Sequence, residues 1–207
     1  MKKIMLLAGM AAMMATTVVT FDSCRKGAED PAISLRSRKA RLVGEWKLTE
    51  GNDTSTNGSF TSYTAYTETT ETVSTGSGSA MSNPYEEKMT FNADGTFEIY
   101  EKTTNASSGS YDVMTTTGTW DFNSGVGEET KMAKVILTPT NVEEVSTSGS
   151  SITTTNYAYV NNALVFTIDL VRLSNKELKV YSIDNSVSTG TSTSSSTSVS
   201  HKTYSAL

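Results

Sequence analysis

The stretch that decides the fold is Leu42-Val43-Gly44-Glu45-Trp46-Lys47-Leu48, which follows a basic segment at residues 33–41. Leu35 and Leu42 lie seven residues apart, on one face of a helix, whereas apolar and polar residues alternate from Gly44 onward. A change from a helical period to strict alternation marks the end of a helix and the start of a strand. The sequence therefore predicts a short N-terminal helix over residues 33–41 and a first strand over residues 44–54, with Gly44 as the hinge.

The clearest hairpin follows further along the chain. Met89 and Phe91 alternate toward one face, Asn92-Ala93-Asp94-Gly95 forms the turn, and Phe97 and Ile99 return on the next strand. Asp-Gly between alternating hydrophobic residues is a strong hairpin signal. A second hairpin is predicted at Asn161-Asn162, between strands at residues 152–160 and 163–171.

The remaining alternating segments predict further strands. We expect strands at residues 60–75, 111–122, 131–145, 178–183 and within 197–205, with Pro139 at a bulge or an edge. Ser-, Thr- and Gly-rich segments at residues 76–84 and 185–196 predict loops.

These segments indicate an all-β domain of about eight to ten antiparallel strands in sequential order. Such strands close most easily as an up-and-down β-barrel, which removes exposed edges; a β-sandwich is the competing architecture. The 34 threonines and 29 serines suit strands with polar outer faces. A barrel that spans a membrane is disfavoured, because its outward positions must be apolar and here they are Thr, Ser, Lys and Glu.

The first residues have the composition of a secretory leader. Met1-Lys2-Lys3 is positive, residues 4–21 carry no charge, and Phe21-Asp22-Ser23-Cys24 ends the apolar run. A small residue before a cysteine at this point resembles the signal of a bacterial lipoprotein, which implies a diacylated Cys24 and a stable membrane anchor. We therefore expect a signal peptide at residues 1–23, a lipid-anchored tether at 24–32 and a barrel domain at 33–207.

The segment Ile33-Ser34-Leu35-Arg36-Ser37-Arg38-Lys39-Ala40-Arg41 followed by Gly44-Glu45-Trp46 resembles the start of lipocalin-like lipoproteins of Bacteroidota. The resemblance implies that Trp46 plugs one end of the barrel and that Arg172 covers this ring; Lys179 is the alternative cation. Cys24 is followed by Arg25 and not by the aspartate that retains lipoproteins at the inner membrane of enteric bacteria, which by analogy favours the outer membrane. We also expect a monomer. The basic residues of the helix are interpreted as a solvated face, or else as a contact with anionic lipid head groups.

Charge and residue types exclude several functions. After residue 23 the chain has 15 Lys and Arg against 21 Asp and Glu, an acidic balance that argues against nucleic acid as a partner. His201 and Cys24 are each the only residue of their type, so neither a catalytic triad nor a zinc site can be assembled. We expect no enzyme activity, no metal and no cofactor. The carboxylate pairs at residues 86–87, 128–129 and 143–144 are interpreted as solvated edge charges.

Binding is the predicted class of function. A barrel of this size can enclose one small apolar molecule, and ligand cavities are lined by apolar and aromatic side chains. The candidate lining residues are Phe91, Phe97, Ile99, Trp120, Phe122, Tyr157, Tyr159, Phe166 and Ile168, which a filled core would explain equally well. One alternative is a filled barrel that binds glycans or proteins through its Ser/Thr-rich loops; another is an inhibitor that inserts residues 76–84 into an enzyme cleft.

Overall fold

The computed structural model describes residues 37–76, 78–123, 133–159, 164–189 and 193–207. This part of the chain forms one short helix and an eleven-stranded antiparallel sheet. The elements are α2 (Arg38–Leu42), β1 (Gly44–Asn57), β2 (Phe60–Thr67), β3 (Thr70–Thr75), β4 (Met81–Phe91), β5 (Thr96–Thr104), β6 (Tyr111–Asn123), β7 (Ala133–Ser148), β8 (Ser151–Ala158), β9 (Phe166–Leu173), β10 (Glu177–Thr189) and β11 (Thr193–Ala206). Within the described ranges, no helix has the length and apolar character needed to cross a bilayer.

The sheet closes on itself, which confirms the predicted antiparallel barrel. Around its narrow end, eight strands pair in a ring: β1, β4, β5, β6, β7, β9, β10 and β11. The first residues of β1 pair with β4, but from Glu50 onward β1 pairs with β2, and β3 then pairs with the start of β4. The β2–β3 hairpin thus enters the wall between β1 and β4, and the ring that passes through it has ten strands.

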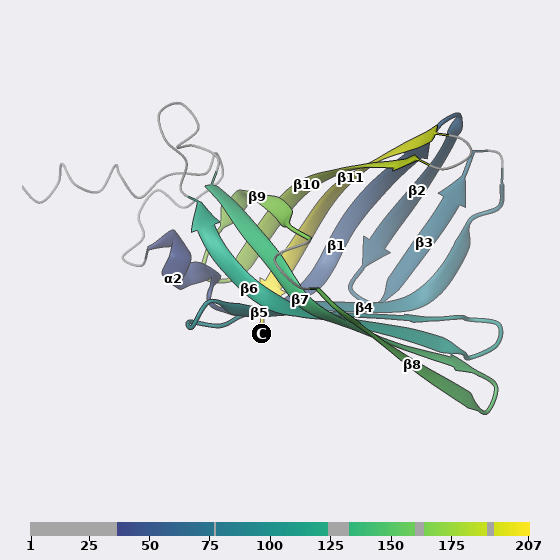
Figure 1. Cartoon of the computed structure of the whole chain (residues 1–207), viewed down its shortest axis with the longest axis horizontal. Coiled ribbons are helices and arrows are strands. Elements are labelled where there is room, and N and C mark those ends of the chain that lie inside the picture. The colour runs from purple at the N-terminus through teal and green to yellow at the C-terminus, as the bar shows by residue number, and fades with distance from the viewer. Residues whose placement is uncertain (1–36, 77, 124–132, 160–163, 190–192) are drawn as a thin grey trace, which may run out of the picture.

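The other side of the wall opens toward the same end. β8 and β9 both pair with β7, β8 along Asn141–Ser148 and β9 along Ala133–Leu137. In the described residues β9 follows β10 only as far as Tyr181, so β8 and the far half of β10 diverge (Figure 1). The predicted hairpin between residues 152–160 and 163–171 is therefore wrong, because β7 lies beside both strands. The Asn161-Asn162 turn lies outside the described residues.

The core fills the narrow end. Its largest buried side chains come from strands distant in the sequence: Trp46, Phe91, Leu173, Leu178 and Tyr204 are each at most 2% exposed. Phe91 pairs with Phe97 across the predicted 89–99 hairpin, where Gly95 has a positive φ of 88°. Burying one such large apolar side chain stabilises the fold by about 1.5–3 kcal/mol. The narrow end is thus a packed interior rather than a container.

Helix α2 closes this end of the barrel (Figure 1). Ser37 caps the helix by accepting from the Ala40 N–H, and the Trp46 indole Nε1 donates to the Leu42 carbonyl at 2.8 Å. Trp46 therefore does lie at a closed end of the barrel. In the described residues the helix begins at Arg38, whereas the predicted helix began at residue 33. Residues 33–36 lie outside the described part.

Two basic residues of α2 are buried, contrary to the predicted solvated face. Arg38 and Arg41 are 5% and 4% exposed, and they donate to the backbone carbonyls of Leu170 and Leu173 in β9. They hold the helix on the barrel, so neither is part of a solvated face. Lys39 lies over the Trp120 ring at 5.2 Å from its centroid.

Arg172 does not have the expected role of covering Trp46. Its Nε forms an ion pair with Glu177 Oε2 at 2.7 Å, across the turn between β9 and β10, and its side chain is 38% exposed. Arg172 therefore pairs with its neighbour Glu177 instead of making the predicted contact with the Trp46 ring.

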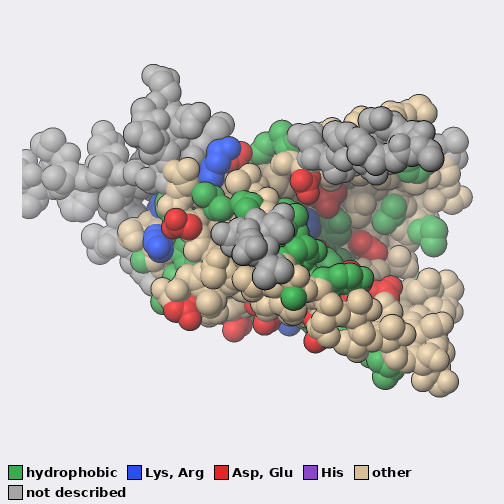
Figure 2. Space-filling model, viewed as in Figure 1, with side chains coloured by type: hydrophobic (Ala, Val, Ile, Leu, Met, Phe, Trp, Pro, Cys, Tyr) green, Lys and Arg blue, Asp and Glu red, His purple; other side chains and the backbone are tan. Residues whose placement is uncertain are grey.

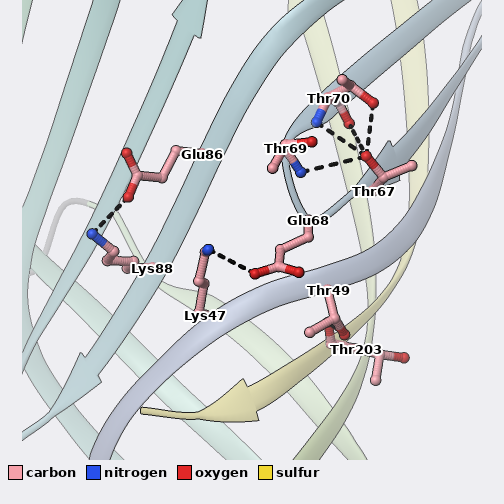
Figure 3. A network of polar contacts seen from close by, with 9 residues as sticks. All are labelled: Lys47, Thr49, Thr67, Glu68, Thr69, Thr70, Glu86, Lys88 and Thr203. Carbon is pink, nitrogen blue, oxygen red and sulfur yellow. Dashed lines mark hydrogen bonds and ion pairs between the residues drawn. The ribbon is translucent and has the colours of Figure 1, made fainter.

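Three predicted loops and strands also differ. Residues 60–75 form two strands, because the Thr67 hydroxyl accepts from the Thr69 and Thr70 N–H groups and turns the chain (Figure 3). The predicted loop at 76–84 ends early, since β4 begins at Met81. The predicted loop at 185–196 is largely a hairpin of β10 with β11, with residues 190–192 outside the described part.

A close approach between β6 and β7 explains why a glycine occupies position 118. A Cβ at Gly118 would lie 2.2 Å from the Thr138 carbonyl oxygen and 2.7 Å from Pro139 Cα. The register of this strand pair shifts at the same point, which confirms the bulge predicted at Pro139.

Candidate ligand-binding site

Above the apolar core the inward side chains become polar, and Glu87 lies at their centre. The inward positions of β4 are Tyr85, Glu87 and Met89, since side chains alternate along a strand. Glu87 is 4% exposed and accepts hydrogen bonds from Tyr85 Oη at 2.7 Å and from Tyr204 Oη. Lys202 Nζ lies 2.6 Å from Glu87 Oε2 in an ion pair. This cluster forms a floor between the packed core and the wide end.

A second carboxylate and a second tyrosine extend the floor. Glu101, inward on β5, accepts from Tyr85 Oη at 3.0 Å. Tyr66 of the inserted hairpin donates to Asp53 Oδ2 at 2.9 Å, and its ring centroid lies 5.0 Å from that of Tyr85. The ring of Tyr66 also lies below Lys202, at 4.7 Å from the ammonium.

The floor holds more negative than positive charge. Burial raises the pKa of Glu101, and the charge of Glu87 raises it further, while Lys202 opposes both effects. Burial alone would lower the pKa of Lys202, but the charges of Glu87, Asp53 and Glu101 together raise it. Burial and Glu87 raise the pKa of the Tyr85 and Tyr204 hydroxyls, so both remain hydrogen-bond donors. One ammonium thus faces three carboxylates.

Two adjoining cavities lie on this floor, of about 410 and 370 Å³. Glu101, Met114 and Glu144 line both of them. The other walls of the first are mostly polar and comprise Tyr66, Glu71, Tyr85, Thr103, Asp112, Val113 and Ser146. The second is mostly apolar, with Ile99, Val142, Tyr157, Tyr159, Leu164 and Phe166. Figure 2 shows acidic and hydrophobic side chains together in the hollow at the open end.

The predicted lining residues divide between core and cavity. Phe91, Phe97 and Trp120 are at most 4% exposed in the packed core, and Phe122 and Ile168 pack against that core. These five residues line neither of the two cavities. The residues that do line the second cavity are Ile99, Tyr157, Tyr159 and Phe166.

The sequence interpretation missed the polar members of the site. It took the carboxylate pairs for solvated edge charges, but Glu87 is buried and Glu144 lines both cavities, while Glu143 is exposed. The pair at residues 128–129 lies outside the described part. Counting back in twos from the inward Phe91 places Glu87 and Tyr85 inside, so the signal was present in the alternation.

Comparison of the sequence with models of protein families places this chain in one of them. A family model described as a domain of unknown function (DUF5004) matches residues 22–175, so the chain belongs to that family. The match ends before β10 and β11, and the second of these strands carries Lys202 and Tyr204. No curated protein and no solved structure matches the chain.

Proposed function

We propose that this protein binds a small, largely apolar molecule in the two adjoining cavities at the wide end of its barrel. The observation that carries the proposal is the division of the interior into a solid narrow end and a hollow wide end of about 410 and 370 Å³. Cavities of roughly 300–1,000 Å³ that combine apolar walls with a few polar groups are typical of small-molecule sites. The alternative of a filled barrel is weaker, since the wide end of the described interior is hollow.

The apolar wall favours the body of such a ligand. Phe166 begins β9, and Leu164 lies just before it. Tyr157 lies near the end of β8, and Tyr159 follows that strand directly. The Tyr159 N–H donates to the Thr140 carbonyl of β7 at 2.9 Å, which fixes this segment against the barrel wall. Aromatic rings held in this way bury large areas of an apolar ligand. The proposed activity is binding rather than catalysis.

The proposal includes a location. The leader at residues 1–23 and the following Cys24 support a lipoprotein whose acyl chains anchor it to the outer membrane, as in lipocalin-like lipoproteins of Bacteroidota. The barrel would then hold its ligand in the periplasm or at the cell surface. Residues 1–36 lie outside the described part, so this step depends on the sequence alone.

A fluorescence titration tests the binding proposal. N-Phenyl-1-naphthylamine, an apolar probe that brightens in apolar surroundings, should bind the full-length chain. Met114→Trp should obstruct binding and reduce the signal, because Met114 lines both cavities and the larger indole would take up part of the space beside it. Thr115→Trp adds the same bulk on the opposite face of β6 and is the matched control. Equal binding by both variants, with unchanged circular dichroism, would rule out this site.

A further inference from the structure

The two cavities lack basic side chains on their walls. Within the described residues, the first cavity is lined by the carboxylates of Glu71, Glu101, Asp112 and Glu144, and neither cavity is lined by a lysine or an arginine. The nearest cation, Lys202, is already paired with Glu87 at 2.6 Å and is 13% exposed. The space therefore has an uncompensated negative field.

Among the described residues, the hydrogen-bond donors to the two carboxylates shared by the cavities are phenol groups. Glu101 lies 3.0 Å from Tyr85 Oη and shares the one proton of that hydroxyl with Glu87, and Glu144 accepts from Tyr157 Oη at 3.5 Å. A phenol donates one proton and neutralises no charge. Burial and the neighbouring Glu87 raise the pKa of Glu101 although Lys202 lowers it, so Lys202 offsets the negative charge beside Glu101 only in part. A cation beside Glu101 would remove this imbalance.

The aromatic walls suit the same ligand. Tyr66 and Tyr85 line the first cavity and Tyr157, Tyr159 and Phe166 line the second, so the carboxylates lie between two groups of rings. Ring faces attract cations and also pack against hydrocarbon. A purely apolar ligand would desolvate Glu101 and Glu144 without supplying a counter-charge, which costs free energy.

We infer that the ligand is an amphipathic organic cation, with its apolar body on the Phe166 wall and its ammonium group between Glu101 and Glu144. This inference rests on the proposed function, because it specifies the ligand class of the same cavities. A neutral ligand of the same shape would pack against the apolar walls but leave the charges of the carboxylates uncompensated. An anion would be repelled by all four carboxylates.

Three probes that differ in one group provide the test. 1-Naphthylmethylamine, 1-naphthalenemethanol and 1-naphthoate share one ring system and are cationic, neutral and anionic at neutral pH. Calorimetric titration of the full-length chain should give a dissociation constant for the amine roughly tenfold below that of the alcohol, and the carboxylate should bind weakest. Glu101→Gln and Glu144→Gln should each weaken amine binding about fivefold and leave alcohol binding unchanged. Glu143→Gln, which removes the same charge one residue along β7 on the exposed face, should change neither.

Every outcome separates the inference from the proposed function. Equal affinities for amine and alcohol, tighter binding of the carboxylate, or an amine preference that survives both Gln variants would overturn the inference, while binding blocked by Met114→Trp would keep the proposed function. Binding of N-phenyl-1-naphthylamine without binding of the amine would also overturn the inference alone. Absence of binding by all four probes would overturn both.

Discussion

The Glu87–Lys202 ion pair allows the effect of burial to be measured at constant geometry. Its Nζ–Oε2 distance is 2.6 Å and its side chains are 4% and 13% exposed. On the outer face of β4, Lys88 Nζ and Glu86 Oε1 are also 2.6 Å apart, with side chains 41% and 38% exposed (Figure 3). Glu87→Gln keeps an acceptor for the tyrosine hydroxyls but removes the carboxylate that Lys202 contacts directly, which leaves the buried ammonium with Asp53 and Glu101 alone.

The expected magnitudes differ between the two pairs. Breaking a buried ion pair by removing one partner costs about 3–5 kcal/mol, because the remaining charge stays desolvated. A solvated pair contributes about 0.2–1 kcal/mol, since water screens it. Domains of this kind have a free energy of unfolding of about 5–15 kcal/mol, so the loss at Glu87 is large enough to measure.

Two double-mutant cycles in urea provide the assay. One combines Glu87→Gln with Lys202→Met, and the other combines Glu86→Gln with Lys88→Met. The coupling energy of the buried pair should reach about 2–3 kcal/mol, and that of the outer pair should stay below about 1 kcal/mol. Equal coupling energies in the two cycles would refute the reasoning that Glu87 and Lys202 form a buried, interdependent floor.

Three further predictions test other parts of the structure. Gly118→Ala should destabilise the barrel by about 1–3 kcal/mol because the methyl group meets backbone of β7; the melting temperature measures this, and an unchanged value, as expected for the exposed control Thr119→Ala, would contradict it. Glu101→Gln should raise the melting temperature at neutral pH. Folding raises the pKa of Glu101 above its ordinary value of 4.5, so the protonated side chain stabilises the folded state fully below pH 4.5. This stabilisation is lost as the pH rises through the pKa of the folded state. The difference from wild type should therefore vanish in acid, and a constant difference across pH would contradict this cause. Expression of the full chain in a diderm bacterium should give a membrane-bound product with the added mass of a diacylglyceryl group, and Cys24→Ser should release it unmodified; acyl mass retained in that variant would contradict lipidation at Cys24.

Short-range patterns in the sequence predicted the narrow end of the barrel well. The change of period at Gly44, the Asp94-Gly95 turn and the alternation through Trp120 all report local geometry, and the structure confirms β1, the β4–β5 hairpin and β6. The break at Thr67 was missed because Thr is common in strands and its hydroxyl also stabilises turns. Local propensity alone does not separate these two uses.

Long-range pairing and the polar interior were beyond this kind of pattern. β8 and β9 follow one another in the sequence, yet both pair with β7, and a partner on the far side of a loop leaves no local signal. The inward Glu87, Glu101 and Glu144 have the parity of core residues but the chemistry of surface residues. A sequence interpretation that equates polar with outward therefore assigns such residues to solvent, as it did for Glu87 and Glu144.

The number of strands explains why the cavities lie where they do. A ring of eight strands has an interior just wide enough for side chains to fill, and the diameter increases with the number of strands. The eight-stranded narrow end is packed accordingly, whereas insertion of β2–β3 between β1 and β4 widens the ring to ten. The inserted hairpin also supplies Tyr66 and Glu71 to the wall of the first cavity. It therefore both widens the interior and contributes an aromatic ring and a carboxylate to the wall of the proposed ligand site.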